Sequence, residues 1–150
     1  MSAMHAAWLA TIERIKDVPG LSLSLGFFPL TKTLLASSVR SGGNAFNISP
    51  SDGPLLIVFI HPIWAEAGDD AKMHGEVERL LEEFNTMAKE KGKLHRYIFP
   101  NYGYPKSDLF AGYGEESVEM MRKAAEKVDP EGVFQKCVPG GFKLGLAEKH

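Results

Sequence analysis

Aromatic side chains are concentrated in one short stretch of the chain, between His95 and Tyr113. A tyrosine offers a flat apolar ring and a phenol that donates or accepts a hydrogen bond, and the intervening glycines and prolines restrict the backbone. This combination is typical of a pocket for a planar or polycyclic organic ligand. Rings that merely cover the edge of a sheet are an equally good interpretation. The aromatic residues of the stretch are His95, Tyr97, Phe99, Tyr102, Tyr104, Phe110 and Tyr113.

Phenols and imidazoles are the groups that we expect to carry chemistry, since both exchange protons. The candidate catalytic residues are Tyr102, His61 and Tyr104. His61 follows an apolar run and precedes Pro62, where a histidine that simply caps a strand end is at least as good an interpretation. The predicted substrate-binding residues are Tyr97, Phe99, Asn101, His95, Trp64 and Phe27.

Other reactive patterns are weak in this sequence. His74 and Glu78 share a helix face, but no second histidine completes an H-E-x-x-H pattern, so we expect a solvated face and no metal site. Cys137 is the single cysteine and is interpreted as a small buried hydrophobe without a disulfide. Gly42 and Gly43 are interpreted as a chain turn in preference to an anion-binding nest.

Hydrophobic periodicity predicts the elements that position these residues. We expect an α+β fold, with helices packed on one face of a small, mostly antiparallel sheet, in a single domain over residues 1–150. The continuous apolar run Leu55–Ile60 predicts a buried central strand, and the end of the chain from Val133 is expected to be mostly extended. The predicted helices are Ser2–Val18, Thr31–Val39, Asp69–Lys91 and Glu115–Val128, and the other predicted strands are Leu21–Phe28 and Leu94–Phe99.

Composition limits the partners. The 150 residues include 17 basic and 19 acidic side chains, a formal net charge of −2, so nothing attracts the chain globally to nucleic acid or to anionic membranes. No apolar run approaches the roughly 18–20 residues of a membrane span, and the N-terminus lacks the pattern of a signal peptide. We therefore expect a soluble, cytoplasmic protein with no nucleic-acid or membrane partner.

Two groups of motifs in the last third of the chain resemble the berberine-bridge-enzyme-like branch of FAD-linked oxidoreductases, especially its fungal members. The first group, N-Y…Y-G-x-E, is formed by Asn101-Tyr102 and Tyr113–Glu116. The second, D-P-x-G-V-F-Q…V-P-G-G-F-K, is formed by Asp129–Gln135 and Val138–Lys143. Upstream, Val18–Leu21, Gly42–Asn44 and Asp52–Leu55 also fit, so that the resemblance covers essentially the whole chain.

The resemblance implies that the chain is the later part of the family's substrate domain. The family's N-terminal flavin domain, with its phosphate-binding loop and its FAD-tethering histidine, has no counterpart in this sequence, so we expect no cofactor. Relatives commonly have Y-x-N-Y where this chain has Phe99-Pro100-Asn101-Tyr102. The first phenol of that motif is therefore replaced by Phe99, which cannot act as a base, whereas Tyr102 is kept.

Three functions follow from these observations. The main prediction is a flavin-independent enzyme that binds a polyketide-, terpenoid- or alkaloid-like intermediate on the sheet face and promotes a cyclisation, isomerisation or pericyclic step by positioning and hydrogen bonds. The first alternative is a substrate-domain part or subunit of an FAD-linked oxidoreductase, in which case FAD is the cofactor. The second is a non-catalytic small-molecule binding module. Because the sheet face would otherwise be bare, we also expect a homodimer.

Overall fold

The computed structural model describes residues 2–145 and has the predicted α+β class. Its helices are α1 (Ser2–Ile15), α2 (Lys32–Arg40), α3 (Asp70–Glu90), α4 (Glu115–Val128) and α5 (Val133–Lys136). Its strands, β1 (Ser22–Leu30) and β2 (Leu55–Ile63), form a two-stranded antiparallel sheet. The residues divide into two compact units. The first unit combines the chain up to Phe28 with Leu56–His95, and the second combines Pro29–Leu55 with the chain from Arg96 onward.

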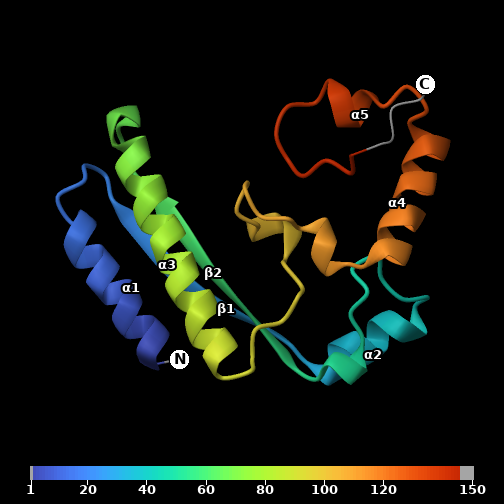
Figure 1. Ribbon diagram of the computed structural model, residues 1–150, viewed down its shortest axis with the longest axis horizontal. Helices are drawn as coiled ribbons and strands as arrows, with labels where there is room; N and C mark the ends of the chain where they lie inside the picture. The colour runs from blue at the N-terminus through green and yellow to red at the C-terminus, as the bar shows by residue number, and fades with distance from the viewer. Residues whose placement is uncertain (1, 146–150) are drawn as a thin grey trace. The chain divides into compact units, whose positions relative to one another are not determined.

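In the first unit, α1 and α3 lie against one face of the two strands (Figure 1). The predicted apolar stripe of the long helix is confirmed, because α3 buries Met73, Val77, Leu80 and Phe84 at spacings of three and four residues. Met73 joins Ile15, Val18 and Leu23 in a core onto which Ile60 and Trp64 pack. One face of the sheet is therefore covered by helices.

The other face of the sheet carries side chains that alternate with those of the core. Phe59 of β2 lies across Gly26 of β1, where a Cβ atom would come within 2.0 Å of the phenyl ring. Phe28 is 50% exposed and Ile63 is 49% exposed on the same face. The prediction that Leu55–Ile60 forms a buried central strand is wrong for the described residues: β2 has a single partner strand, and its side chains are half-buried or exposed.

The predicted strand Leu94–Phe99 is also not formed. Two of its carbonyls find partners other than a neighbouring strand: the Ile98 carbonyl accepts a hydrogen bond from the Tyr113 hydroxyl at 3.2 Å, and the Phe99 carbonyl accepts one from the Tyr102 N–H at 3.2 Å. The end of the chain differs from the prediction as well, since the turn at Gly132 (φ 68°) leads into α5. Cys137 follows α5 and is exposed, so its interpretation as a buried hydrophobe is wrong.

The second unit is built around aromatic rings. Leu109, Tyr113 and Val118 form its buried cluster, against which Tyr97 and Phe46 pack together with other partly buried side chains. Helices α2 and α4 belong to this unit, which contains little regular structure between them. Among the described residues of the chain, no helix is both long enough and apolar enough to cross a membrane.

Candidate functional site

Two exposed polar side chains of the aromatic segment are carried by one tight turn, Phe99–Tyr104, which we name the aromatic turn. Proline at position 100 starts a 3₁₀ turn over Pro100–Tyr102, in which the Tyr102 N–H donates to the Phe99 carbonyl at 3.2 Å. The Tyr104 carbonyl accepts from the Ser107 N–H at 2.8 Å. Asn101 is exposed and Tyr102 is 56% exposed, so both side chains are accessible to a ligand.

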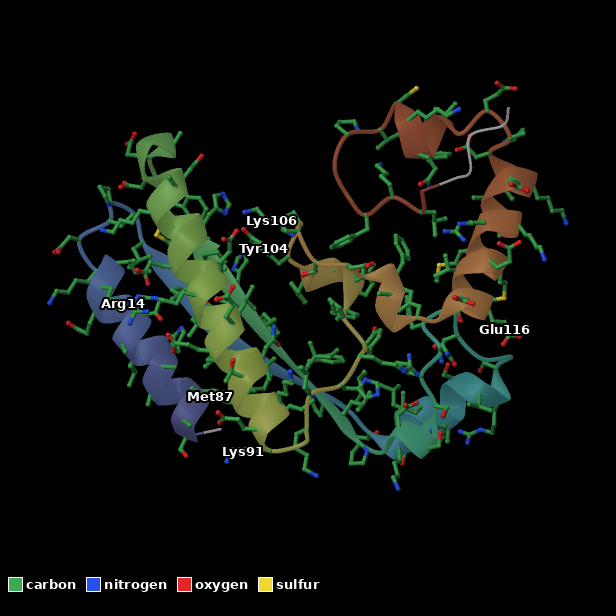
Figure 2. All side chains as sticks on the ribbon, in the orientation of Figure 1. Arg14, Met87, Lys91, Tyr104, Lys106 and Glu116 are labelled. Atoms are coloured by element: carbon green, nitrogen blue, oxygen red, sulfur yellow. The ribbon has the colours of Figure 1, made fainter. Side chains whose placement is uncertain are left out.

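Contacts of aromatic rings stabilise this turn. The rings of Phe99 and Tyr102 have centroids 5.7 Å apart. The ring of Phe142 lies against Gly103, where a Cβ would come within 2.7 Å of it. The two predicted residues Phe99 and Tyr102 are thus brought together by the fold, with Asn101 between them in sequence. Figure 2 marks Tyr104, which belongs to the turn, and Lys106 just beyond it.

Two other tyrosines of the segment face the interior of the second unit. Tyr113 is 1% exposed, and its ring centroid is 6.1 Å from that of Tyr97 and 5.4 Å from that of Phe46. Burial, followed by the nearby Tyr97, raises the pKa of Tyr113 to about 12, and burial also raises the pKa of Tyr97. Both phenols are therefore neutral at physiological pH, where a buried neutral phenol donates a hydrogen bond and does not serve as a base. For these two rings, the interpretation as packing groups describes the geometry best.

Arg96, which the sequence analysis did not single out, anchors the aromatic segment. Its guanidinium donates hydrogen bonds to the carbonyls of Gly112 and Asn47 and lies 3.7 Å from the Asp52 carboxylate. The Gly112 backbone also packs closely on this residue, because a Cβ at Gly112 would come within 2.1 Å of the Arg96 carbonyl oxygen. An arginine isolated between aromatic neighbours was the sequence signal for such a role, since a guanidinium can satisfy several carbonyls at once.

The remaining predicted site residues belong to the first unit. His61 is exposed on β2, and Phe27 is 39% exposed on β1. The Trp64 indole N–H donates to the Asp70 carboxylate at 2.7 Å, and its ring meets that of His74 edge-on with centroids 5.5 Å apart. His95 is half-buried at the end of this unit. The fold therefore divides the predicted residues between its two units and gathers only Phe99, Asn101, Tyr102 and Tyr104 within one turn.

Two hollows on the described surface have no predicted site residue in their lining. One, of about 340 Å³, follows α3, where Figure 2 marks Met87, and is lined by Arg79, Glu82, Glu83, Thr86 and Met87. The other, of about 420 Å³, lies beside α4 and is lined by Glu119, Arg122, Lys123, Glu126 and Gly145. Charged side chains predominate in the hollow beside α4, which is unlike the apolar lining that binds polycyclic ligands.

A dinucleotide cofactor needs several free backbone N–H groups for its pyrophosphate. Gly42 and Gly43 do not supply them, because their N–H groups donate to the carbonyls of Val39 and Ser38 at 3.1 and 2.9 Å and close the end of α2. This confirms their interpretation as a turn. The first turn of α3 contains Asp70 and that of α4 contains Glu115 and Glu116, which would repel a phosphate. These parts of the described chain do not fit the pyrophosphate of FAD.

Comparison with known proteins relates the chain to part of several fungal flavoenzymes. It is 37% identical over 120 residues to the FAD-dependent monooxygenase FUP4 of Fusarium proliferatum (strain ET1), a match that covers 80% of this chain and 23% of that enzyme. It is 31% identical over 139 residues to the FAD-dependent monooxygenase CTB5 of Cercospora nicotianae, covering 89% of this chain and 29% of that enzyme. The chain thus spans about a quarter of the length of these relatives.

A further relative has a different name. Oligopeptidase PhomG' of Diaporthe leptostromiformis is 31% identical over 146 residues, which cover 96% of this chain but only 12% of that enzyme. No protein-family model matches the chain, and no solved structure matches it. The similarity that recurs is to a limited segment of FAD-dependent monooxygenases.

Proposed function

We propose that this chain is the substrate-binding part of an FAD-linked oxidoreductase of the berberine-bridge-enzyme-like type, with the flavin held by residues outside the described chain. The observation that carries the proposal is the recurrent match to about a quarter of several fungal FAD-dependent monooxygenases. The misfit of Gly42, Gly43 and the acidic helix starts to a pyrophosphate agrees with it. These relatives favour the FAD-linked alternative over a flavin-free cyclisation, which they do not support.

Within that enzyme, the aromatic turn would hold the organic substrate. The exposed phenol of Tyr102 and the exposed amide of Asn101 would donate or accept hydrogen bonds from oxygen or nitrogen atoms of the substrate. The ring of Phe99 behind Tyr102 would limit the rotation of the phenol and so reduce the entropy lost on binding. FAD, when bound, would supply the redox chemistry. A polyketide-, terpenoid- or alkaloid-like substrate stays a prediction.

A chimeric enzyme tests the proposal. In the Fusarium proliferatum monooxygenase, the matching 120-residue segment would be replaced by the corresponding part of this chain. We expect the chimera to keep its flavin, measured by visible absorbance, and to turn over the substrate of the parent enzyme. The parent protein, prepared in parallel, is the reference for both measurements. Loss of flavin or of turnover in the chimera, with the parent fully active, would contradict the equivalence of the two segments.

Substitutions in the chimera then test the aromatic turn. Tyr102→Phe removes one hydroxyl and is expected to lower turnover about 10²-fold with unchanged flavin content, because acid–base or hydrogen-bonding groups typically contribute that much. Lys91→Ala, an exposed substitution just after α3, is the matched control and should leave turnover unchanged. Equal turnover in both variants would show that Tyr102 does not belong to the substrate site. It would not contradict the proposal that the chain is part of an FAD-linked enzyme.

A further inference from the structure

Gly103, in the aromatic turn, has a backbone conformation that does not by itself require glycine. Its φ of −65° and ψ of 133° are ordinary extended values that residues with side chains also adopt. A Cβ atom is excluded at this position for another reason, because it would come within 2.7 Å of Cζ and 2.9 Å of Cε2 of the Phe142 ring. The absence of a side chain at residue 103 therefore allows this ring to lie directly on the backbone of the turn.

Phe142 belongs to the segment Val133–Leu144, which we name the C-terminal clasp. Much of this segment lies at the surface, where Val133 is 48% exposed, Phe134 67% and Val138 43%. Phe142 instead is half-buried and packs against the buried aromatic cluster of the second unit. The C-terminal clasp therefore contacts the interior of this unit through the same ring that lies on the aromatic turn.

Hydrogen bonds within the C-terminal clasp fix the backbone next to this ring. The following residue, Lys143, donates through Nζ to the carbonyls of Phe134 and Val138 at 3.0 and 2.8 Å. The next N–H, that of Leu144, donates to Oε1 of Gln135 at 2.9 Å. Both residues after the ring are thus bonded to α5 or to the chain just beyond it. The position of the ring is therefore held by these bonds as well as by its own packing.

We propose that Phe142 is a positioning residue for substrate binding, which holds the aromatic turn in the conformation that exposes Asn101 and Tyr102. This inference rests on the proposed function, in which these two side chains contact the substrate. Gly103 directly follows Tyr102 in the chain, so the position of its backbone sets the position of the exposed phenol. The substrate would then bind a turn that is already in place, and less conformational entropy would be lost on binding.

Hydrogen exchange in the 150-residue chain, followed by NMR, tests the contact independently of the proposed function. The N–H groups of Tyr102 and Gly103 donate to carbonyls of the same turn and so report on its conformation. Phe142→Leu removes the ring atoms that meet Gly103 and should make both amides exchange about tenfold faster. Phe110→Leu, the same substitution in another ring of the buried aromatic cluster, is the matched control and should change these rates by about twofold or less. Equal exchange rates in the two variants would overturn the positioning role.

A compensating substitution separates the position of the ring from a general loss of packing. Gly103→Ala alone brings a Cβ against Cζ of Phe142, an atom that is absent when Phe142→Leu is added. In the chimeric enzyme, with the exchanged segment extended to include both positions, each single variant should raise KM for the substrate about tenfold, with kcat changed less. The double variant should have a KM closer to that of the unmodified chimera than either single variant. Independent effects, which would multiply in the double variant, would overturn the proposed contact.

The outcomes in the chimera also distinguish this inference from the proposed function. If Phe142→Leu leaves KM unchanged while Tyr102→Phe lowers turnover, the aromatic turn binds the substrate and the positioning role of Phe142 is wrong. If neither substitution affects catalysis in a chimera that keeps its flavin and its turnover, the aromatic turn is not the substrate site, and both the site and its positioning residue are wrong. A raised KM in Phe142→Leu, with Phe110→Leu unchanged, supports the positioning role.

Discussion

The two units of the molecule are stabilised in different ways. The first unit consists of regular elements, two helices against a pair of strands, with an apolar stripe at helical spacing as its core. The second unit contains long irregular segments whose backbone groups bond to side chains. Lys143 donates to the carbonyls of Val138 and Phe134 at 2.8 and 3.0 Å, and the Asp129 carboxylate accepts from the Phe134 N–H at 2.9 Å.

The candidate site lies in the second unit, which differs from the first in how its backbone groups are satisfied. Irregular backbone must find its hydrogen-bond partners one by one, which is why side chains such as Arg96 and Asn44 serve that purpose in the second unit. A segment built in this way can expose residues such as Asn101 and Tyr102 at a chosen point, as functional loops commonly do. The first unit instead consists of regular helices and strands around an apolar core.

Deleting core volume in the first unit is expected to have the largest effect. Leu80→Ala empties a fully buried site on α3 and should lower the free energy of unfolding by about 2–5 kcal/mol. Leu9→Ala, at a position that is 46% exposed on α1, is the matched control and should cost about 0.5 kcal/mol or less. Urea unfolding followed by tryptophan fluorescence reports on this unit, because both tryptophans, Trp8 and Trp64, belong to it.

Glycine substitutions should have opposite signs in the two units. Gly112→Ala forces a Cβ within 2.1 Å of the Arg96 carbonyl oxygen and should destabilise the second unit by about 1–3 kcal/mol. Gly75→Ala adds a methyl group to α3 with nothing within 4 Å, and should stabilise the first unit by about 0.5–1 kcal/mol. Tyrosine absorbance reports on the second unit, which contains all four tyrosines. If both substitutions changed the free energy of unfolding in the same direction, the contrast between the two units would be contradicted.

Removing the arginine anchor should have a smaller effect on the second unit. Arg96→Met keeps the length of the side chain but loses the hydrogen bonds to Gly112 and Asn47, which should cost about 1–2 kcal/mol because the guanidinium is partly exposed. Arg40→Met, which loses a bond to the exposed Ser37 hydroxyl, should cost about 0.5 kcal/mol or less. Urea unfolding followed by tyrosine absorbance measures both. If the two substitutions cost the same, Arg96 does not anchor the segment.

Sequence periodicity predicted the first unit better than the second, for a physical reason. The α3 stripe from Met73 to Phe84 and the alternation in β1 are local patterns, so the elements were predictable. The segment Leu94–Phe99 has the apolar and aromatic residues of a strand, but its Ile98 carbonyl bonds to Tyr113, 15 residues away. A strand requires a neighbouring strand, and composition alone does not reveal whether one is present.

For the candidate site, aromatic content singled out residues 95–113, and the role of this stretch as a site stays a prediction. The structure has a 3₁₀ turn at Pro100–Tyr102 within it. Which rings are exposed could not be predicted, because the exposure of Tyr102 and the burial of Tyr113 depend on distant contacts, such as that of Tyr113 with Phe46. Arg96 was missed for the same reason, since its partner Asn47 is 49 residues earlier in the chain.

The smallest expected effect tests whether Tyr113 is a packing group. Tyr113→Phe leaves the Ile98 carbonyl without its hydroxyl donor and should cost about 1 kcal/mol. Burial raises the pKa of Tyr113 from 10 to about 12, so the protonated phenol contributes stability that is fully present below pH 10 and is lost as the pH rises toward 12.

Alkaline titration at 295 nm should therefore show a late tyrosine transition near pH 12 in the unmodified protein, and Tyr113→Phe should abolish it. Tyr102→Phe, at a ring that is 56% exposed, is the matched control and should leave that transition in place. If Tyr113 titrated together with exposed tyrosines, its hydroxyl would be open to solvent. The second unit would then lack the buried aromatic centre that separates packing rings from the exposed phenol of the aromatic turn.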